Sequence, residues 1–596
     1  MQKKKSIRDI CFNLFQKYAD IRKLHKKSDI IEKDFEIVKD LNYFYLTLTN
    51  VHYSSFYKLL NIFKNDPSFC ASMFILNPMK LVRTSDCIIN YEKALELVEK
   101  FHIDINIDEK QYAWTYDMLL FQNNCLYMQQ KVFNKLFMNE FGNLDNLDKF
   151  CSYFQINNNH YTTLTIFHDM EVELGDLLLD LYYNKINVFS KNIDSYLNSY
   201  QKSNDIKLTK QQVKAIENTI KNKFSIICGL PGTGKSTITK VIVDYFENDS
   251  ICLVAPTGMA VNNLRNKCVS SNKTNVHIGT LHKMIYDQFD KIDNIDLMII
   301  DEFSMVDIFM FKKILTWCQH YKCKLLILAD DQQLPPIQAG YPLSALLSSK
   351  IFKVIKLKTI KRQDNGLLKN VILDLSDNKV VHPSTFDNKS IHFYNYSEEN
   401  ILKIQNKFKI DCKFITPQHK YNEGTININK ILQKNKNNLQ QTIYPSYKKT
   451  LPYYFHYNDL VVRITNDYKS EALYANGDIG IISKDVDNNI QIKYLETNMI
   501  QNVSKEELYE DFQLAYCLTV HKVQGSQYDN IVLIMVDNHE FSWNNHTSKK
   551  LLYTAISRAK KNCIILGNPE LFMNAQKQNN IVEITYFLKK FNQYSL

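Results

Sequence analysis

The sequence predicts an α/β protein with two lobes, each built on a parallel sheet. From about residue 205 onward, short apolar runs of strand length alternate with stretches of helical period, and the alternation occurs twice. Strands that alternate with helices are typical of parallel sheets with crossover helices, which bind ligands at the carboxyl ends of their strands. The expected strands are Phe224–Cys228, Ile251–Ala255, Leu297–Asp301 and Leu325–Ala329 in the first series, and Cys412–Thr416, Gln513–Thr519, Ile531–Val536 and Cys563–Leu566 in the second.

A β-rich stretch interrupts the second series at about residues 450 to 510. Its apolar runs alternate with polar residues, and it carries Asn476-Gly477, a dipeptide that favours tight turns. We expect a small barrel here, inserted into the second lobe.

The first 200 residues are mostly helical by period. Only two of the fourteen glycines, Gly142 and Gly175, occur before residue 229, so tight turns are rare in this region. The tripeptide Asp108-Glu109-Lys110 has a D/E-x-K form found in nucleases, but so short a pattern occurs by chance, and we assign it to a solvated face. The region is expected to be a helical scaffold rather than a site of chemistry.

The stretch FSIICGLPGTGKST contains the spacing G-x-x-x-x-G-K-[ST] directly after an apolar run. Glycines let backbone N–H groups turn toward a di- or triphosphate, and the following helix presents its positive N-terminus. Lys235 is expected to reach the outer phosphates, and Ser236 to hold Mg²⁺. The predicted phosphate loop comprises Gly229, Leu230, Pro231, Gly232, Thr233, Gly234, Lys235, Ser236 and Thr237.

Two polar clusters follow expected strands of the first lobe. Asp301-Glu302 ends the run LMII, where one carboxylate can bind Mg²⁺ and a second can orient the attacking water. An acidic pair that only caps a helix is the alternative. Gln333, after the next strand, is placed to touch a γ-phosphate.

Other polar residues fit contacts to a nucleotide or to nucleic acid. Gln212, on a helix just before the phosphate loop, has the paired donor and acceptor that reads an adenine edge. Thr257, Thr280 and His282 lie on expected loops, where short donors suit the phosphates of a single strand. In the second lobe, Arg558 would face the phosphate loop across a cleft, as in a two-lobed motor.

Composition argues against disulfide-bonded, zinc- or iron–sulfur-binding, and membrane-spanning classes of protein. The formal net charge of +10 over 596 residues leans toward a polyanionic partner without establishing one. The thirteen cysteines include no C-x-x-C pair, and several lie in apolar runs, which argues against disulfides, zinc sites and iron–sulfur clusters. No apolar run is long enough to span a membrane. These features predict a soluble, cytoplasmic protein.

Eight motifs in order make the chain resemble a superfamily 1 helicase of the RecD kind over about residues 205 to 570. The motifs are GLPGTGKST, APTGMA, GTLHKMI, IIDEFSM, ADDQQLPPIQAG, NGDIGII, LTVHKVQGSQYDN and LLYTAISRAK. About 200 residues precede the motor, which favours the RecD subunit of exodeoxyribonuclease V over longer stand-alone relatives.

The resemblance implies two RecA-like lobes, a small SH3-like barrel inserted in the second, and a helical N-terminal domain. It also implies an ATP-dependent 5′-3′ DNA helicase that uses ATP and Mg²⁺ within a RecBCD-type helicase–nuclease for double-strand break repair and homologous recombination. The implied domains are 1–150 for partner docking, 151–204 as connector, 205–350 as the first lobe, 351–449 with 511–596 as the second lobe, and 450–510 as the insertion.

The resemblance assigns roles residue by residue. The implied catalytic residues are Lys235, Asp301, Glu302, Gln333, Arg362 and Arg558; the nucleotide-binding residues are Gln212, the phosphate loop and Gly525; the metal ligands are Ser236 and Asp301; and the DNA contacts are Thr257, Thr280, His282, Thr519 and His521. The family pattern departs at four positions, where Met259 replaces a Lys, Ala329 a Gly, Val523 a Ser and Gln527 a Glu. None of these removes a catalytic group.

The implied partners are single-stranded DNA, double-stranded DNA ends, and RecB-like and RecC-like subunits in a heterotrimer. Docking is expected through the N-terminal domain, which is rich in candidate interface aromatics. Those aromatics include Tyr43, Phe44, Tyr45, Tyr53, Phe56 and Tyr57. Three alternatives stay open: a stand-alone helicase of the Pif family, a structural or regulatory subunit with a slow ATPase, and a small-molecule kinase, which would not explain the second lobe.

Overall fold

The computed structural model describes most of the chain from Met79 onward. The described residues are 79–82, 90–101, 105–122, 125–156, 159–183, 192–268, 275–285, 291–349, 351–360, 366–387, 389–408, 412–436, 441–445, 451–465, 474, 476–495, 497–539, 541–545 and 547–577. The aromatics proposed for docking, Tyr43 to Tyr57, lie outside them, as does Arg362. By contacts the chain divides into two compact units, residues 1–171 with 338–340, and the remainder.

The first lobe contains a six-stranded parallel sheet in the order β6-β5-β7-β8-β4-β9. The strands are β4 (Phe224–Gly229), β5 (Ile251–Ala255), β6 (Val276–Thr280), β7 (Leu297–Ile300), β8 (Lys324–Ala329) and β9 (Val354–Leu357). All four strands expected from the sequence are present within one residue at each end. β4, β5, β7 and β8 are buried along their whole length, as their unbroken apolar runs predict.

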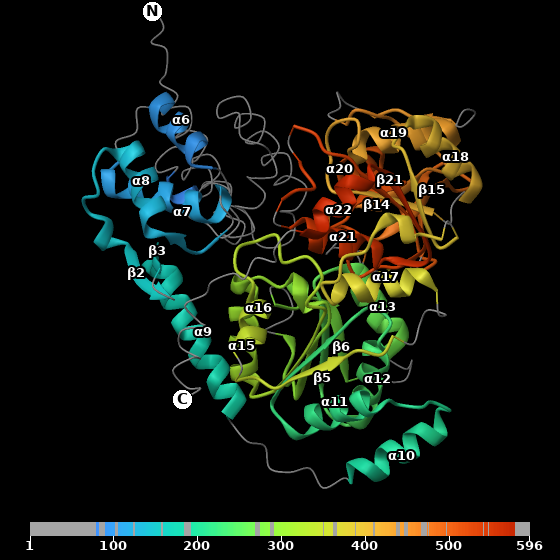
Figure 1. The fold of residues 1–596 in the computed structure, drawn as a ribbon, viewed down its shortest axis with the longest axis horizontal. Coiled ribbons are helices and arrows are strands. Elements are labelled where there is room, and N and C mark those ends of the chain that lie inside the picture. The colour runs from blue at the N-terminus through green and yellow to red at the C-terminus, as the bar shows by residue number, and fades with distance from the viewer. Residues whose placement is uncertain are drawn as a thin grey trace, which may run out of the picture. The chain divides into compact units, whose positions relative to one another are not determined.

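Helices connect these strands and cover the sheet (Figure 1). They are α10 (Ile193–Ser203), α11 (Lys210–Lys221), α12 (Lys235–Tyr245), α13 (Gly258–Cys268), α14 (Leu281–Lys283), α15 (Ile308–Tyr321) and α16 (Pro342–Ser348). The core is made of strand residues such as Ile227 and Leu253, packed against Ile216 of α11 and Ile238 of α12. Leu197 of α10 belongs to the same core.

The second lobe repeats the design with a five-stranded parallel sheet in the order β10-β21-β20-β11-β19. Its elements are β10 (Ile391–Tyr394), β11 (Cys412–Thr416), β19 (Cys517–Thr519), β20 (Tyr528–Met535) and β21 (Ala559–Gly567), with α17 (Leu367–Ser376), α18 (Glu398–Phe408), α19 (Thr425–Lys436), α21 (Ser548–Ile556) and α22 (Pro569–Lys577). The parallel sheets in both lobes confirm the predicted α/β class.

The expected strand Gln513–Thr519 is wrong as a single element. It is two strands in different sheets, β18 (Phe512–Leu514) in the insertion and β19 in the second lobe. Ala515 and Tyr516 separate them, and both are buried apolar residues, so the hydrophobic pattern continues across the change of sheet. Hydrophobic periodicity reports burial, and it cannot show which sheet a strand joins.

The β-rich stretch forms a five-stranded antiparallel sheet in the order β17-β16-β15-β14-β18. Its elements are β14 (Leu460–Arg463), β15 (Ile479–Lys484), β16 (Ile490–Tyr494), β17 (Ile500–Asn502) and the helix α20 (Lys505–Asp511), with β12 (Thr442–Ile443) and β13 (Phe455–His456) pairing beside it. Asn476-Gly477 does not form a two-residue hairpin. Gly477, at φ +99°, ends a longer connection, where its N–H donates to the Arg463 carbonyl at 2.9 Å.

The described part of the N-terminal unit is not entirely helical. It has α5 (Met79–Val82), α6 (Tyr91–Phe101), α7 (Ile107–Asp117), α8 (Gln130–Phe141) and the start of α9 (Thr165–Tyr183), with a three-stranded antiparallel sheet of β1 (Met128–Gln129), β3 (Asn159–Leu164) and β2 (Cys151–Ile156). Helical period did not reveal this sheet. Lys149 pairs with Asp108 at 2.7 Å, consistent with a solvated role for Asp108-Glu109-Lys110.

None of the described helices is long and apolar enough to cross a membrane.

Candidate active site

The phosphate loop lies where β4 ends and α12 begins. Gly232 and Gly234 adopt φ of +83° and +90°, left-handed conformations that only glycine accepts without strain. The Lys235 Nζ donates to the Gly229 carbonyl at 2.6 Å, and the Thr233 hydroxyl donates to the Leu230 carbonyl at 2.8 Å. The loop is thus held in its curved shape by its own residues, with the N-terminus of α12 at its end.

Gln212 supports this loop from α11. Its N–H and Oε1 complete a capping box with Thr209, at 3.2 and 2.9 Å, and its Nε2 donates to the Thr233 carbonyl at 3.0 Å. A Cβ on Gly234 would lie only 2.3 Å from that Nε2. Gln212 is buried, and it is not among the described residues that line the cavity discussed below. Its proposed reading of adenine stays a prediction.

The two predicted carboxylates follow β7 as expected. The Asp301 Oδ1 accepts the Glu302 N–H at 2.9 Å. Burial, and then the neighbouring charge of Glu302, raise the pKa of Asp301 to about 6, against the opposing effect of Lys235. Glu302 has a left-handed backbone at φ +51°, and its Oε2 is buried with no hydrogen-bond partner among the described residues. Strain and an unsatisfied buried oxygen are typical of functional positions.

Gln333 lies after β8 in a buried polar group. Its Nε2 donates to the Asp330 Oδ2 at 3.2 Å, and the Tyr553 hydroxyl donates to the same oxygen at 3.0 Å. Burial raises the pKa of Asp330 and also that of Tyr553. The Gln333 Oε1 is buried without a partner among the described residues. Since Tyr553 belongs to α21, this group joins the two lobes.

Arg558 follows α21 in the second lobe and is 2% exposed. Its guanidinium is fixed by three donations: Nε to the Thr554 carbonyl at 3.2 Å, Nη1 to the Ser526 carbonyl at 3.3 Å, and Nη2 to the Ser557 hydroxyl at 3.1 Å. A buried arginine held in this way loses little further side-chain entropy when it binds an anion.

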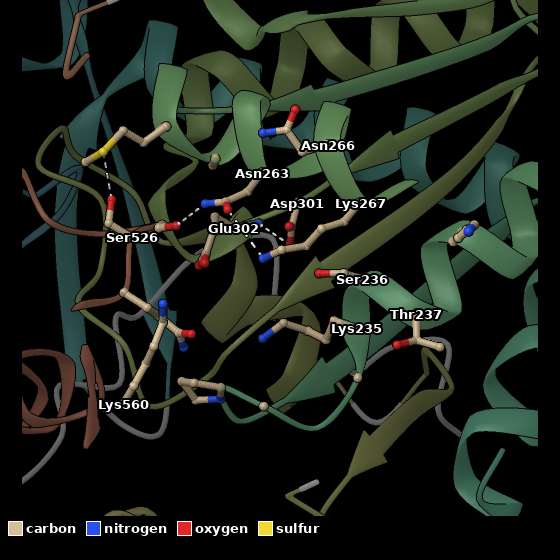
Figure 2. A pocket seen from close by; sticks show the side chains of 18 of the residues that line it. Lys235, Ser236, Thr237, Asn263, Asn266, Lys267, Asp301, Glu302, Ser526 and Lys560 are labelled. Atoms are coloured by element: carbon tan, nitrogen blue, oxygen red, sulfur yellow. Dashed lines mark hydrogen bonds between the residues drawn. The ribbon is translucent and has the colours of Figure 1, made fainter. Parts of the chain in front are cut away.

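A cavity of about 930 Å³ brings these groups together (Figure 2). It is lined from the first lobe by Lys235, Ser236, Asp301, Glu302 and Gln333, and from the second by Arg558. The cavity therefore brings together predicted residues that lie up to about 320 positions apart in the chain, and their roles toward a nucleotide stay predictions. Arg362 is the predicted catalytic residue that lies outside the described residues.

The oxygen ligands that line the cavity suit Mg²⁺. Among the described residues no group of three or more His, Cys, Asp or Glu side chains could hold a metal. Mg²⁺ needs no such group, because it binds through one or two protein oxygens and the substrate phosphates. Asp301 and Ser236 offer those oxygens beside the unsatisfied Oε2 of Glu302.

The predicted DNA contacts are spread over both lobes. Thr257 and Thr280 accept backbone N–H groups at 3.3 Å, from Ala260 and Lys283, in the first turns of α13 and α14. His282 is exposed. The structure places each on a loop or helix start, as predicted, without testing a DNA contact.

The other two predicted contacts lie at the end of β19 in the second lobe. Thr519 is the buried last residue of β19. Burial, and then the neighbouring His419, lower the pKa of His521. A lowered pKa favours the neutral imidazole of His521, which suits hydrogen bonding more than charge pairing.

Sequence reasoning missed the part of α13 that lines the cavity. Asn263 and Lys267 face it one helical turn apart, and the Lys267 Nζ donates to the Asn263 Oδ1 at 3.3 Å (Figure 2). Spacing of i and i+4 behind APTGMA was the available signal. Met259, the residue that departs from the family Lys, is 3% exposed and packs with the core of the second lobe.

A two-lobed motor whose phosphate loop faces an arginine across a cleft is the class that this fold and site define. Comparisons agree with it. Residues 207–395 match the AAA domain family, and residues 514–566 match the UvrD-like helicase C-terminal domain family.

Two curated proteins and one solved structure are similar to this chain. The chain is 25% identical to the RecBCD enzyme subunit RecD of Buchnera aphidicola from Acyrthosiphon pisum, over 86% of this chain and 96% of the relative. It is also 25% identical to the ATP-dependent RecD2 DNA helicase of Deinococcus radiodurans, over 64% of this chain and 52% of the relative. The Pif1 helicase of Candida albicans superposes with a TM-score of 0.41 at 16% identity, over 66% of this chain and all of that one. The chain is thus similar to RecD subunits and to the RecD2 helicase over most of its length.

Proposed function

We propose that this protein is an ATP-dependent 5′-3′ DNA helicase and the motor subunit of a RecBCD-type helicase–nuclease. In that role it would act in double-strand break repair and homologous recombination. The observation that carries the proposal is the shared cavity, in which Lys235 and Asp301 of one lobe and Arg558 of the other face the same volume. Hydrolysis of ATP bound in this cavity would remove the γ-phosphate that both lobes contact. Loss of that shared contact would drive the opening and closing of the lobes.

Each side chain has a role that its position allows. Lys235 and the backbone N–H groups of the phosphate loop bind the β- and γ-phosphates of ATP. Ser236 and Asp301 would hold Mg²⁺, which neutralises phosphate charge when bound. Glu302, with a free buried oxygen, orients the attacking water. Gln333 is placed to donate to the γ-phosphate from its Nε2, which has a second N–H beside the one bound to Asp330, and Arg558 stabilises the charge of the transition state.

DNA is proposed to cross both lobes near Thr257, Thr280, His282, Thr519 and His521. These are hydroxyl and imidazole donors rather than residues of a recognition helix, so binding is expected to follow the phosphate backbone and to be insensitive to sequence. The antiparallel sheet β17-β16-β15-β14-β18 is proposed to be the SH3-like insertion of this family. It runs from Leu460 to Leu514, so its last strand lies just past the expected range of about residues 450 to 510.

The N-terminal region, residues 1–150, is proposed to dock RecB-like and RecC-like subunits in a heterotrimer, with 151–204 as the connector. The remaining proposed boundaries are 205–350 for the first lobe and 351–449 with 511–596 for the second. Helix α10 lies within the proposed connector, but its Leu197 is 3% exposed and packs in the core of the first lobe. A motor fragment would therefore need to retain α10.

Strand displacement tests the proposal. Duplexes with either a 5′ or a 3′ single-stranded tail are offered with ATP and Mg²⁺, and separated strands are quantified. We expect unwinding of the 5′-tailed duplex alone, and none when Glu302→Gln replaces the wild type. Unwinding from the 3′ tail would refute the polarity. ATP turnover without unwinding on either substrate would favour the regulatory alternative. Purification of the active chain from its native source without RecB-like and RecC-like subunits would favour a stand-alone helicase.

A further inference from the structure

The loop Gly525–Ser526 of the second lobe is anchored on helix α13 of the first. The Asn263 Nδ2 donates to the Gly525 carbonyl at 3.0 Å, and the Ser526 hydroxyl donates to the Met259 Sδ at 3.0 Å (Figure 2). Gly525 has φ +80°, and a Cβ there would lie 3.1 Å from the Ala260 Cβ. A glycine with that conformation allows the loop to lie directly against α13.

The same loop fixes Arg558. The Ser526 carbonyl accepts the Arg558 Nη1 at 3.3 Å, so one residue of the loop is bound to α13 through its side chain and to the arginine through its backbone. The path from the first lobe to the guanidinium is therefore short. It runs from Asn263 through the peptide Gly525–Ser526 to Arg558.

Asn263 also faces the nucleotide side of the cavity. Its Oδ1 accepts the Lys267 Nζ at 3.3 Å, and both residues line the cavity with Asp301 and Glu302. One Asn thus uses its acceptor within the first lobe and its donor toward the second. The donor and acceptor of an amide cannot be exchanged without turning the side chain over, so its orientation is set by both partners.

We propose that Asn263 is a positioning residue for Arg558: by holding the Gly525 carbonyl, it fixes the loop whose Ser526 carbonyl orients the guanidinium toward the bound nucleotide. This inference rests on the proposed ATP hydrolysis. The Met259 Sδ, which accepts the Ser526 hydroxyl, holds the same loop at a second point. The residue that replaces the family Lys therefore has a structural role. In this role Asn263 acts through Arg558 rather than on the nucleotide itself.

Asn263→Asp tests the inference because it is isosteric. It keeps an acceptor for Lys267 but places a carboxylate oxygen against the Gly525 carbonyl, where a donor is needed. We expect kcat for ATP to fall about 3- to 10-fold, the equivalent of one lost hydrogen bond, while the Kd for ADP stays within about 2-fold. Asn263→Ala should behave in the same way. Melting temperature, compared with that of Asn248→Ala at an exposed Asn of the same lobe, checks that the fold is kept.

A second readout is the affinity for ADP with aluminium fluoride, a mimic of the transferring phosphate. Wild type should bind it more tightly than ADP, and Asn263→Asp should lose most of that preference. In the Arg558→Lys background, Asn263→Asp should change neither quantity further, because the residue it positions is already altered.

The outcomes separate two failures. If wild type does not hydrolyse ATP, the proposed function is wrong. If wild type is active and Arg558→Lys is impaired, but Asn263→Asp hydrolyses ATP and binds the aluminium fluoride complex as wild type does, the positioning role is refuted. A full additional loss from Asn263→Asp in the Arg558→Lys background would also refute it, since Asn263 would then act through another group such as Asp301.

Discussion

Gly234→Ala is predicted to damage the phosphate loop by a mechanism that the structure specifies. Gly234 has φ +90°, and its added Cβ would lie 2.3 Å from the Gln212 Nε2, where ordinary contact begins at 3.4 Å. Either the loop or the amide must therefore move by about 1 Å. Movement of the amide breaks its 3.0 Å bond to the Thr233 carbonyl, and movement of the loop displaces the N–H groups that bind phosphate.

The magnitude follows from two costs. A left-handed conformation costs a residue with a Cβ about 1–2 kcal/mol. Loss of the bond from Gln212 adds about 1 kcal/mol, which gives a total of about 2–3 kcal/mol. Gly477→Ala is the matched control. Gly477 has φ +99° in the same unit and nothing within 4 Å of its added Cβ, so it carries the backbone cost alone.

Two assays separate these effects. Urea unfolding should show Gly234→Ala to be about 1 kcal/mol less stable than Gly477→Ala. Titration with a fluorescent ADP should show at least about 10-fold weaker binding for Gly234→Ala, which corresponds to 1.4 kcal/mol, and unchanged binding for Gly477→Ala. If the two variants have equal stability and equal affinity, Gln212 does not occupy the space beside the loop, and the reasoning fails.

Three further predictions follow from the same structure. Arg558→Ala should lower ATP turnover about 10³- to 10⁵-fold with little change in nucleotide affinity. If the alanine variant fails to fold, Arg558→Lys, which keeps the charge, replaces it. Equal losses in turnover and affinity would show that Arg558 binds the nucleotide before the reaction and does not act on the transition state. Affinity for single-stranded DNA should fall steeply between low and moderate salt and vary little with sequence, measured by fluorescence anisotropy; a flat salt response would contradict backbone binding. A chain that begins at Asn192 should keep DNA-stimulated ATPase activity and should no longer co-purify with partner subunits. A chain that begins at Asn204 lacks α10 and should be less stable. If either fragment still assembles fully with the partners, the docking surface lies in the lobes.

The sequence predicted most of the side chains that line the cavity because its motifs are local. The phosphate loop, Asp301-Glu302 and Gln333 each follow a strand whose apolar run is unmistakable, and the topology of a parallel sheet brings such strand ends to one edge. Arg558 was placed by the two-lobed pattern and by resemblance; it lines the same cavity as Lys235, and its role stays a prediction.

What the sequence did not predict depends on contacts between distant residues. The division of Gln513–Thr519 between two sheets, the bond from the Gln212 Nε2 to the Thr233 carbonyl, and the bond from Asn263 to Gly525 all depend on segments that carry no common pattern. Met259 appeared as a lost cation, whereas the structure shows a buried residue in the core of the second lobe. Side-chain partners of this kind follow from the fold, which periodicity defines only in outline.

The central claim is that this chain is a DNA-driven ATPase whose phosphate loop performs the chemistry. The most direct test is the rate of phosphate release from ATP and Mg²⁺, with and without single-stranded DNA, for the wild type and for Lys235→Ala. We predict that DNA raises the wild-type rate at least about 10-fold, and that Lys235→Ala abolishes turnover while its melting temperature and circular dichroism match those of the wild type. Wild-type turnover by the Lys235→Ala variant, or a wild-type rate that DNA does not change, would contradict the account.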